Sequence, residues 1–92
     1  MKVHNLKGTS ADHYRKVGLK DWMEYKGVKN APVCSASDCN NLATDGAHVQ
    51  KVGSGDKNWY ICPMCHKHNE STDDVALRFY WPNRLVALSE FH

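Results

Sequence analysis

Four cysteines, arranged as two pairs, constrain this chain more than any other feature of its sequence. Cys34 and Cys39 form a Cys-x4-Cys pair, and Cys62 and Cys65 form a Cys-x2-Cys pair. The chain has 92 residues, of which 41% are hydrophobic, and a domain of this size has a small core that is marginal without help. We therefore expect the cysteines to cross-link and stabilise the fold, either as disulfides or as ligands of a structural metal.

The redox compartment favours the metal. The opening stretch MKVHNLKGTS lacks the apolar run of a signal peptide, and no stretch approaches the roughly 20 apolar residues of a membrane span. We expect a cytoplasmic protein with no membrane partner. Thiols stay reduced in that compartment, so four cysteines in a short chain predict a zinc site. Two disulfides or unliganded thiols are the alternatives.

The preferred ligand set is the four cysteines, Cys34, Cys39, Cys62 and Cys65. His68 is an alternative ligand, because Cys65-x2-His68 repeats the spacing of Cys62-x2-Cys65. In that alternative Cys62 becomes a half-buried thiol at the end of a strand. Four protein ligands leave no open position for a substrate, so the zinc is expected to be structural.

Local patterns predict a helix in the first part of the chain. Residues 1–18 are polar and loop-like, and Leu19–Lys26 can form a short helix that ends at Gly27. This helix places three apolar side chains on one face: Leu19, Trp22 and Met23. The whole chain is expected to be one domain, with its parts at residues 1–30, 31–71 and 72–92.

A β-hairpin is predicted between the two cysteine pairs. A strand within Asn40–Val52 is followed by a turn at Gly53–Asn58 and by a returning strand at Trp59–Ile61. The residues expected to face inward on the first strand are Leu42, Ala43, Ala47 and Val49. Since a cysteine pair, a hairpin and a second pair at a helix start follow one another, the predicted fold is a small α+β treble clef.

The last part of the chain is predicted to hold a short helix and a strand pair. The helix begins within His66–Ser71, and the strands are Leu77–Pro82 and Leu85–Leu88, which we expect to pair with each other. The net charge of +2 is too small to indicate nucleic-acid binding by itself. The surplus of lysine and arginine in residues 1–29 is interpreted as a solvated face.

Histidines and an asparagine around the hairpin carry a family resemblance. The order of Cys34 and Cys39, then Asp45-Gly46-Ala47-His48-Val49, then Asn58-Trp59-Tyr60-Ile61-Cys62-Pro63-Met64-Cys65-His66 resembles the HNH endonucleases that have a four-cysteine zinc knuckle. The resemblance covers roughly residues 34–69. It is most similar to small bacterial and phage proteins with a GAHV strand, a WYI strand and a C-x-x-H-N turn, which suggests a phage or mobile-element origin.

The resemblance implies a site that hydrolyses a phosphodiester in DNA or RNA. His48 would be the general base, Asn58 would brace the loop, and His66 would bind a second, catalytic divalent ion such as Mg, Mn or Ni. Active members of the family carry a metal-binding Asp or His where this chain has Ala47. Asp45, two residues earlier, could replace that ligand only if a bulge or twist brought it to the site.

Several roles stay open at this point. His48 can be a base, a zinc ligand or a hydrogen-bonded structural residue, and His66 and His68 can simply face solvent. For the whole protein we weigh a metal-dependent nuclease against two alternatives. One is a non-catalytic zinc module that binds nucleic acid or protein, and the other is an adaptor with no nucleic-acid role. The absent ligand at Ala47 favours these two alternatives.

Overall fold

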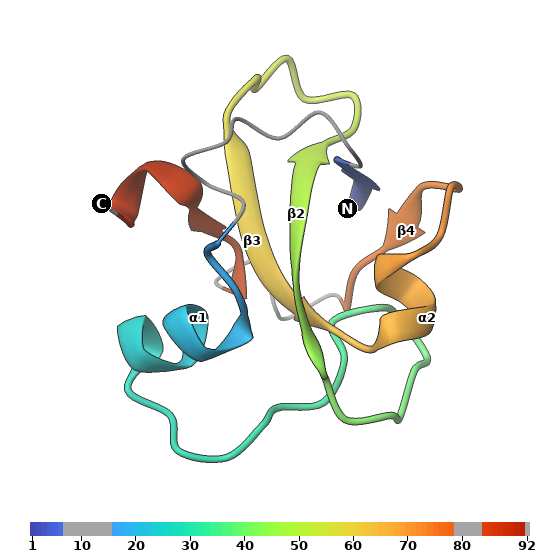
Figure 1. Cartoon of the computed structure of the whole chain (residues 1–92). Coiled ribbons are helices and arrows are strands. Elements are labelled where there is room, and N and C mark those ends of the chain that lie inside the picture. The colour runs from blue at the N-terminus through green and yellow to red at the C-terminus, as the bar shows by residue number, and fades with distance from the viewer. Residues whose placement is uncertain (7–15, 79–83, 92) are drawn as a thin grey trace.

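In the computed structural model, the described residues are 1–6, 16–78 and 84–91 (Figure 1). They form an antiparallel sheet with short helices on either side of it, which is an α+β arrangement. The elements in chain order are β1 (Lys2–Asn5), α1 (Leu19–Lys26), β2 (Asp45–Lys51), β3 (Trp59–Met64), α2 (His66–Asn69), β4 (Val75–Ala76), β5 (Val86–Ala87) and the 3-10 helix η3 (Leu88–Glu90).

The predicted hairpin is confirmed, and it forms the centre of the five-stranded sheet, whose strand order is β4-β1-β2-β3-β5. Strands β2 and β3 pair along their length, from Asp45 opposite Met64 to Gln50 opposite Trp59. β1 pairs with β2, and β5 pairs with β3. The two ends of the chain therefore flank a hairpin that comes from its middle.

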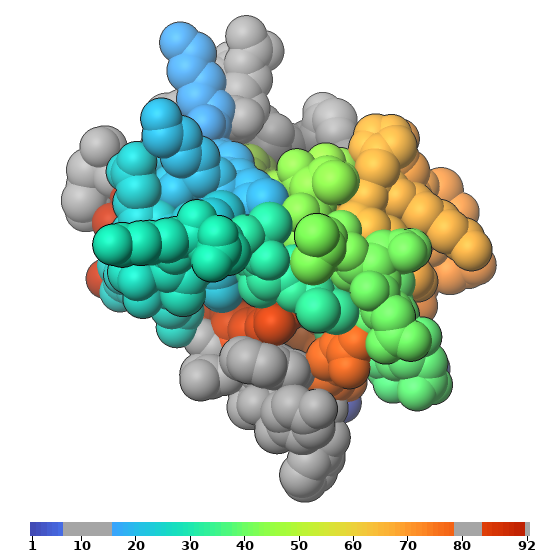
Figure 2. Space-filling model, turned by 90° about the horizontal axis from the view of Figure 1, so that it is seen from below, coloured from blue at the N-terminus to red at the C-terminus, as the bar shows by residue number. Residues whose placement is uncertain are grey.

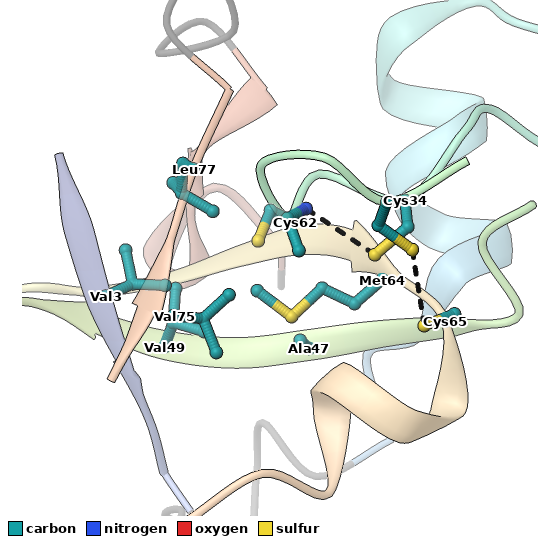
Figure 3. Close-up of a cluster of buried hydrophobic side chains, with 11 residues drawn as sticks. Val3, Cys34, Ala47, Val49, Cys62, Met64, Cys65, Val75 and Leu77 are labelled. Atoms are coloured by element: carbon teal, nitrogen blue, oxygen red, sulfur yellow. Dashed lines mark hydrogen bonds between the residues drawn. The ribbon is translucent and has the colours of Figure 1, made fainter. Parts of the chain in front are cut away.

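The two faces of the hairpin bury different clusters, because side chains alternate along a strand. One face packs against residues 34–39, and Figure 3 shows its labelled members around Met64. The buried residues of this cluster are Val3, Cys34, Ala36, Cys39, Ala47, Val49, Cys62, Met64, Cys65, Val75 and Leu77. The other face packs against α1 and η3 through a smaller cluster, formed by Trp22, Ile61, Val86 and Leu88.

Helix α1 has the predicted bounds and the predicted end. Gly27 adopts a left-handed φ of 72°, and its N–H bonds back to the last turn of the helix, as a C-terminal glycine commonly does. At the other end the Asp21 carboxylate accepts a hydrogen bond from the Gly18 N–H at 2.9 Å. The buried Trp22 donates its indole N–H to the Arg84 carbonyl at 2.7 Å, which ties the helix to the last part of the chain.

Gly46 lets α1 approach the sheet closely. A Cβ added at Gly46 would lie 2.7 Å from the Gly18 carbonyl carbon, the Leu19 nitrogen and Ile61 Cδ1. Two of these three are backbone atoms, which cannot rotate away. The start of α1 therefore rests directly on β2, and only glycine fits at the contact.

Two sequence predictions are corrected by the structure. The loop expected over residues 1–18 contains β1, whose Val3 and Asn5 are buried. Within the described residues, β5 pairs with β3 at one edge of the sheet, β4 pairs with β1 at the other, and Leu77 forms a bridge with Ala36. Residues 79–82 of the predicted Leu77–Pro82 strand lie outside the described residues. Leu42, expected to face inward, is 61% exposed, while the expected inward residues Ala43, Ala47 and Val49 are buried.

The segment after α1 closes one end of the molecule. Seen from below in Figure 2, residues 27–44, coloured from cyan to green, extend in a band from α1 to the neighbourhood of α2. This segment carries the first cysteine pair. Of the helices in the described ranges, none has the length and apolar character needed to cross a membrane.

Candidate metal centre

Three cysteines and one histidine meet beside the hairpin. The ligand atoms of Cys34, Cys39, Cys65 and His68 all lie within 4.8 Å of one another. His68 Nδ1 is 3.2 Å from Cys65 Sγ and 3.7 Å from Cys34 Sγ, and the Cys39 and Cys65 sulfurs are 3.9 Å apart. A tetrahedral zinc ion with bonds of about 2.3 Å to sulfur has ligands roughly 3.8 Å apart. The four side chains could therefore hold a metal such as zinc.

The first two side chains of this group come from a tight turn, residues 34–39, which we call the knuckle. The Ala36 N–H points at Cys34 Sγ at 3.5 Å, and the Cys39 N–H donates to the Ala36 carbonyl at 3.3 Å. Asp38 has a positive φ of 63°, a conformation that Asp tolerates better than most residues. This reversal brings Cys39 back beside Cys34.

The other two side chains of the group come from the junction of β3 and α2. Cys65 is the N-cap of α2, and His68 follows within its single turn. Asn69 donates its N–H to the Cys65 carbonyl at 3.0 Å. A residue three positions along a helical turn lies on the same side as the first, which explains why Cys65 and His68 converge.

The environment of the thiols differs from one cysteine to the next. Burial raises the pKa of Cys34 to about 11. Burial also acts to raise the pKa of Cys65, but hydrogen bonds from the backbone and side chain of His68 and from the other two thiols outweigh it and lower the value to about 6. A thiolate at Cys65 is the form that binds a metal.

Cys62, predicted as a ligand, is not part of this group. It is fully buried in β3, where it shares a face with Met64, and burial raises its pKa to about 12. Figure 3 shows its sulfur turned away from those of Cys34 and Cys65. The structure therefore groups His68, the alternative ligand, with the three other cysteines in place of Cys62. Strand geometry is the reason, because Cys62 lies inside the paired strand, opposite Ala47, while Cys65 lies beyond the strand's end.

The three residues assigned to catalysis by the family resemblance lie in separate places. His48 is on the α1 side of β2, where its Nε2 donates to the Val17 carbonyl at 2.7 Å. Asn58 precedes β3 at the turn, and its backbone N–H donates to Asp56 Oδ1 at 2.9 Å. His66 begins α2 at the opposite end of the hairpin. The structure does not bring these three side chains together.

Asp45 and His66, in contrast, are in direct contact. His66 Nδ1 and Asn69 Nδ2 each lie 2.9 Å from Asp45 Oδ2, and Thr44 donates to Oδ1 at 3.0 Å. Partial burial works against ionisation of this carboxyl, but the hydrogen bonds from Asn69, His66 and Thr44 prevail and lower the pKa of Asp45. His66 directly follows Cys65 in the sequence, and its side chain is largely exposed.

Sequence reasoning missed Asn5, which braces the helix that carries His68. The Asn5 side chain is 6% exposed, and its Nδ2 donates to the carbonyls of His68 and Ser71 at 2.9 and 3.0 Å. A polar side chain in a four-residue strand gives no local signal of such a contact.

No family model, curated protein or solved structure matches this chain.

Proposed function

We propose that this protein is a zinc-stabilised module in which Cys34, Cys39, Cys65 and His68 hold one structural zinc ion. The observation that supports this most directly is the spacing of the four ligand atoms, which all lie within 4.8 Å of one another. Thiolate and imidazole ligands in a tetrahedral arrangement are typical of zinc. Four protein ligands leave no position for substrate, so the ion would stabilise the fold rather than act in chemistry.

The physical role of the ion follows from where its ligands lie. It would join the knuckle to the junction between β3 and α2, two segments that are distant in sequence. Because zinc binds the folded arrangement and not the open chain, its binding free energy adds to the free energy of unfolding. In a chain of 92 residues with a small core, that contribution would decide whether the protein folds.

Metal content of single-site variants tests this proposal. We expect one zinc per wild-type chain by elemental analysis, and loss of zinc in Cys34→Ser, Cys39→Ser, Cys65→Ser and His68→Ala. Cys62→Ala is the matched control, since Cys62 is a buried cysteine outside the ligand group, and it should retain the metal. Zinc lost from Cys62→Ala but kept by His68→Ala would favour the four-cysteine set, and wild-type protein without metal would refute the proposal.

Nucleic acid is the proposed partner of this module, and a protein is the alternative. The similarity of residues 34–69 to HNH endonucleases supports the choice. Labelled single- and double-stranded DNA and RNA, titrated in fluorescence anisotropy, would test it. Binding through phosphates should weaken steeply between low and physiological salt. Absence of binding to every probe at low salt would turn the search toward a protein partner.

A metal-dependent phosphodiester hydrolase is the second candidate, and the contact between Asp45 and His66 favours it. Asp45 Oδ2 lies 2.9 Å from His66 Nδ1, so a carboxylate is available beside His66 although residue 47 is alanine. Plasmid cleavage should be measured with Mg, Mn and Ni for the wild type, His48→Ala and His66→Ala. Cleavage that His66→Ala abolishes would support this candidate. No cleavage with any of the metals would leave the non-catalytic module.

A further inference from the structure

The side chain of Arg78 binds the backbone of two metal ligands at once. Its Nε donates to the Cys34 carbonyl at 3.2 Å, and its Nη2 donates to the Cys39 carbonyl. These two nitrogens are on the same edge of the planar guanidinium, so one rigid group spans both ends of the knuckle. Sequence patterns gave no reason to single out this arginine.

The backbone on either side of Arg78 also forms hydrogen bonds with the knuckle. The Arg78 N–H donates to the Ser35 carbonyl at 3.0 Å, and the Ser37 N–H donates to the Ala76 carbonyl at 2.7 Å. Ala36 and Leu77 form an isolated antiparallel bridge. The segment 76–78 therefore runs alongside the knuckle, and it fixes where the Arg78 side chain begins.

Charge gives the guanidinium a second role. A zinc ion with three thiolates and a neutral imidazole carries one net negative charge. The guanidinium is a cation, and it lies against the two carbonyls that belong to the proposed thiolate ligands. It would offset the negative charge of the loaded centre without occupying a ligand position.

We propose that Arg78 is a positioning residue of the metal centre, which sets metal affinity by holding the Cys34 and Cys39 backbone at the separation that the ion requires. This inference rests on the proposed zinc function. Lysine cannot replace the paired Nε and Nη2 donors of Arg78, which we call the fork. Its ammonium group is a compact charge and does not span two carbonyls in a fixed plane. Loss of a group that orients metal ligands typically costs about 10- to 100-fold in affinity.

Cobalt titration of the full-length protein tests the role of Arg78. Co²⁺ reports ligand geometry through its visible absorption, and competition with zinc then gives the zinc affinity. We compare the wild type with Arg78→Gln, which removes charge and fork, and with Arg78→Lys, which keeps the charge. Lys51→Gln is the matched control, because Lys51 is a partly buried cation paired with Asp56 at the other end of the hairpin.

The expected result is a drop of about 10- to 100-fold in affinity for Arg78→Gln with an altered cobalt spectrum, and a smaller drop for Arg78→Lys. Lys51→Gln should match the wild type within about twofold. Equal affinity and identical spectra for wild type and Arg78→Gln would overturn the inference, as would an equal loss in Lys51→Gln. If Arg78→Gln does not fold, the test rests on Arg78→Lys. A zinc affinity of Arg78→Lys equal to that of the wild type would overturn the proposed role of Arg78, and a weaker affinity would support it. A wild-type protein that binds neither metal would refute the zinc site itself.

Discussion

Asp38 is the one non-glycine residue with positive φ among the described parts of the chain, and it lies within the knuckle. Left-handed backbone costs an ordinary residue about 1–2 kcal/mol, and a β-branched residue tolerates it least. We therefore expect Asp38→Gly to retain or raise the thermal stability of the zinc-loaded protein. Asp38→Val should lower the free energy of unfolding by about 1–2 kcal/mol.

The control for this prediction is Ser37→Val, which places the same side chain at an exposed neighbouring position without positive φ. Thermal melts of the three variants in excess zinc give the comparison. Equal losses in Asp38→Val and Ser37→Val would show that backbone conformation at Asp38 has no special cost.

Asp45 makes stability depend on pH. Its pKa is lowered in the folded protein by the bonds from Asn69, His66 and Thr44, so its contribution is complete above the unfolded value of about 3.9. The contribution is lost as pH falls through the lower, folded value. Urea unfolding of the zinc-loaded proteins should show that the wild type is more stable than Asp45→Asn at neutral pH, where the Asp45 carboxylate is ionised.

Acid protonates the thiolate ligands and releases the metal, so the two proteins are compared at neutral pH with zinc bound. Asp73→Asn serves as the control, since it removes an exposed carboxylate elsewhere. A wild-type protein no more stable than Asp45→Asn at neutral pH would contradict the assignment.

The choice between Cys62 and His68 could not be made from the sequence. Both candidate ligand sets have the same local spacing, so Cys62 and His68 could not be separated without knowing where β3 ends. The strand continues through Met64 and holds Cys62 inside the ladder. Strand length therefore decides which of these two side chains lies beside the other three cysteines, and the aromatic and β-branched pattern at residues 59–61 underestimated that length.

At the scale of elements, the contact between α1 and β2 depends on Gly46. A methyl group there would lie 2.7 Å from two backbone atoms at the start of α1, and forcing extra atoms into a packed contact costs about 1–3 kcal/mol. We expect Gly46→Ala to lower the free energy of unfolding by that amount, as measured by urea titration.

Gly18→Ala is the matched control for Gly46→Ala. A Cβ at Gly18 meets no atom within 4 Å, although Gly18 belongs to the same contact between helix and sheet. Because alanine is less favourable than glycine at a helix N-cap, Gly18→Ala should cost about 0.5–1 kcal/mol, which is less than the cost expected for Gly46→Ala. A Gly46→Ala protein as stable as Gly18→Ala would mean that α1 can shift away from β2 at little cost.

Elements with strong local signals were predictable, and those that depend on distant partners were not. Helix α1 has a clear apolar face and a glycine stop, and the hairpin has a turn-forming segment between two strands. β1 has only four residues and buries an asparagine. β4 and β5 have two residues each, and nothing in their sequence specifies that they pair with β1 and β3 rather than with each other.

At the scale of the whole molecule, we expect folding and zinc binding to be one equilibrium. Above the dissociation constant, each tenfold rise in free zinc should add about 1.4 kcal/mol to the free energy of unfolding. Thermal melts in zinc buffers should therefore show a midpoint that rises with free zinc, and a chelator should unfold the protein. Cys65→Ser should show no such dependence, and a wild-type midpoint insensitive to zinc would contradict a structural role.

The strand order has a consequence for how copies of this protein meet one another. Among the described residues, the outermost strands are β4 and β5, which have only two residues each, so each presents few unpaired backbone groups to a neighbouring sheet. Short outer strands are one of the ways in which natural proteins avoid edge-to-edge aggregation. β1 and β3 are longer, and detaching either outer strand would expose them. Variants that loosen β4 or β5 should therefore self-associate before they lose their secondary structure.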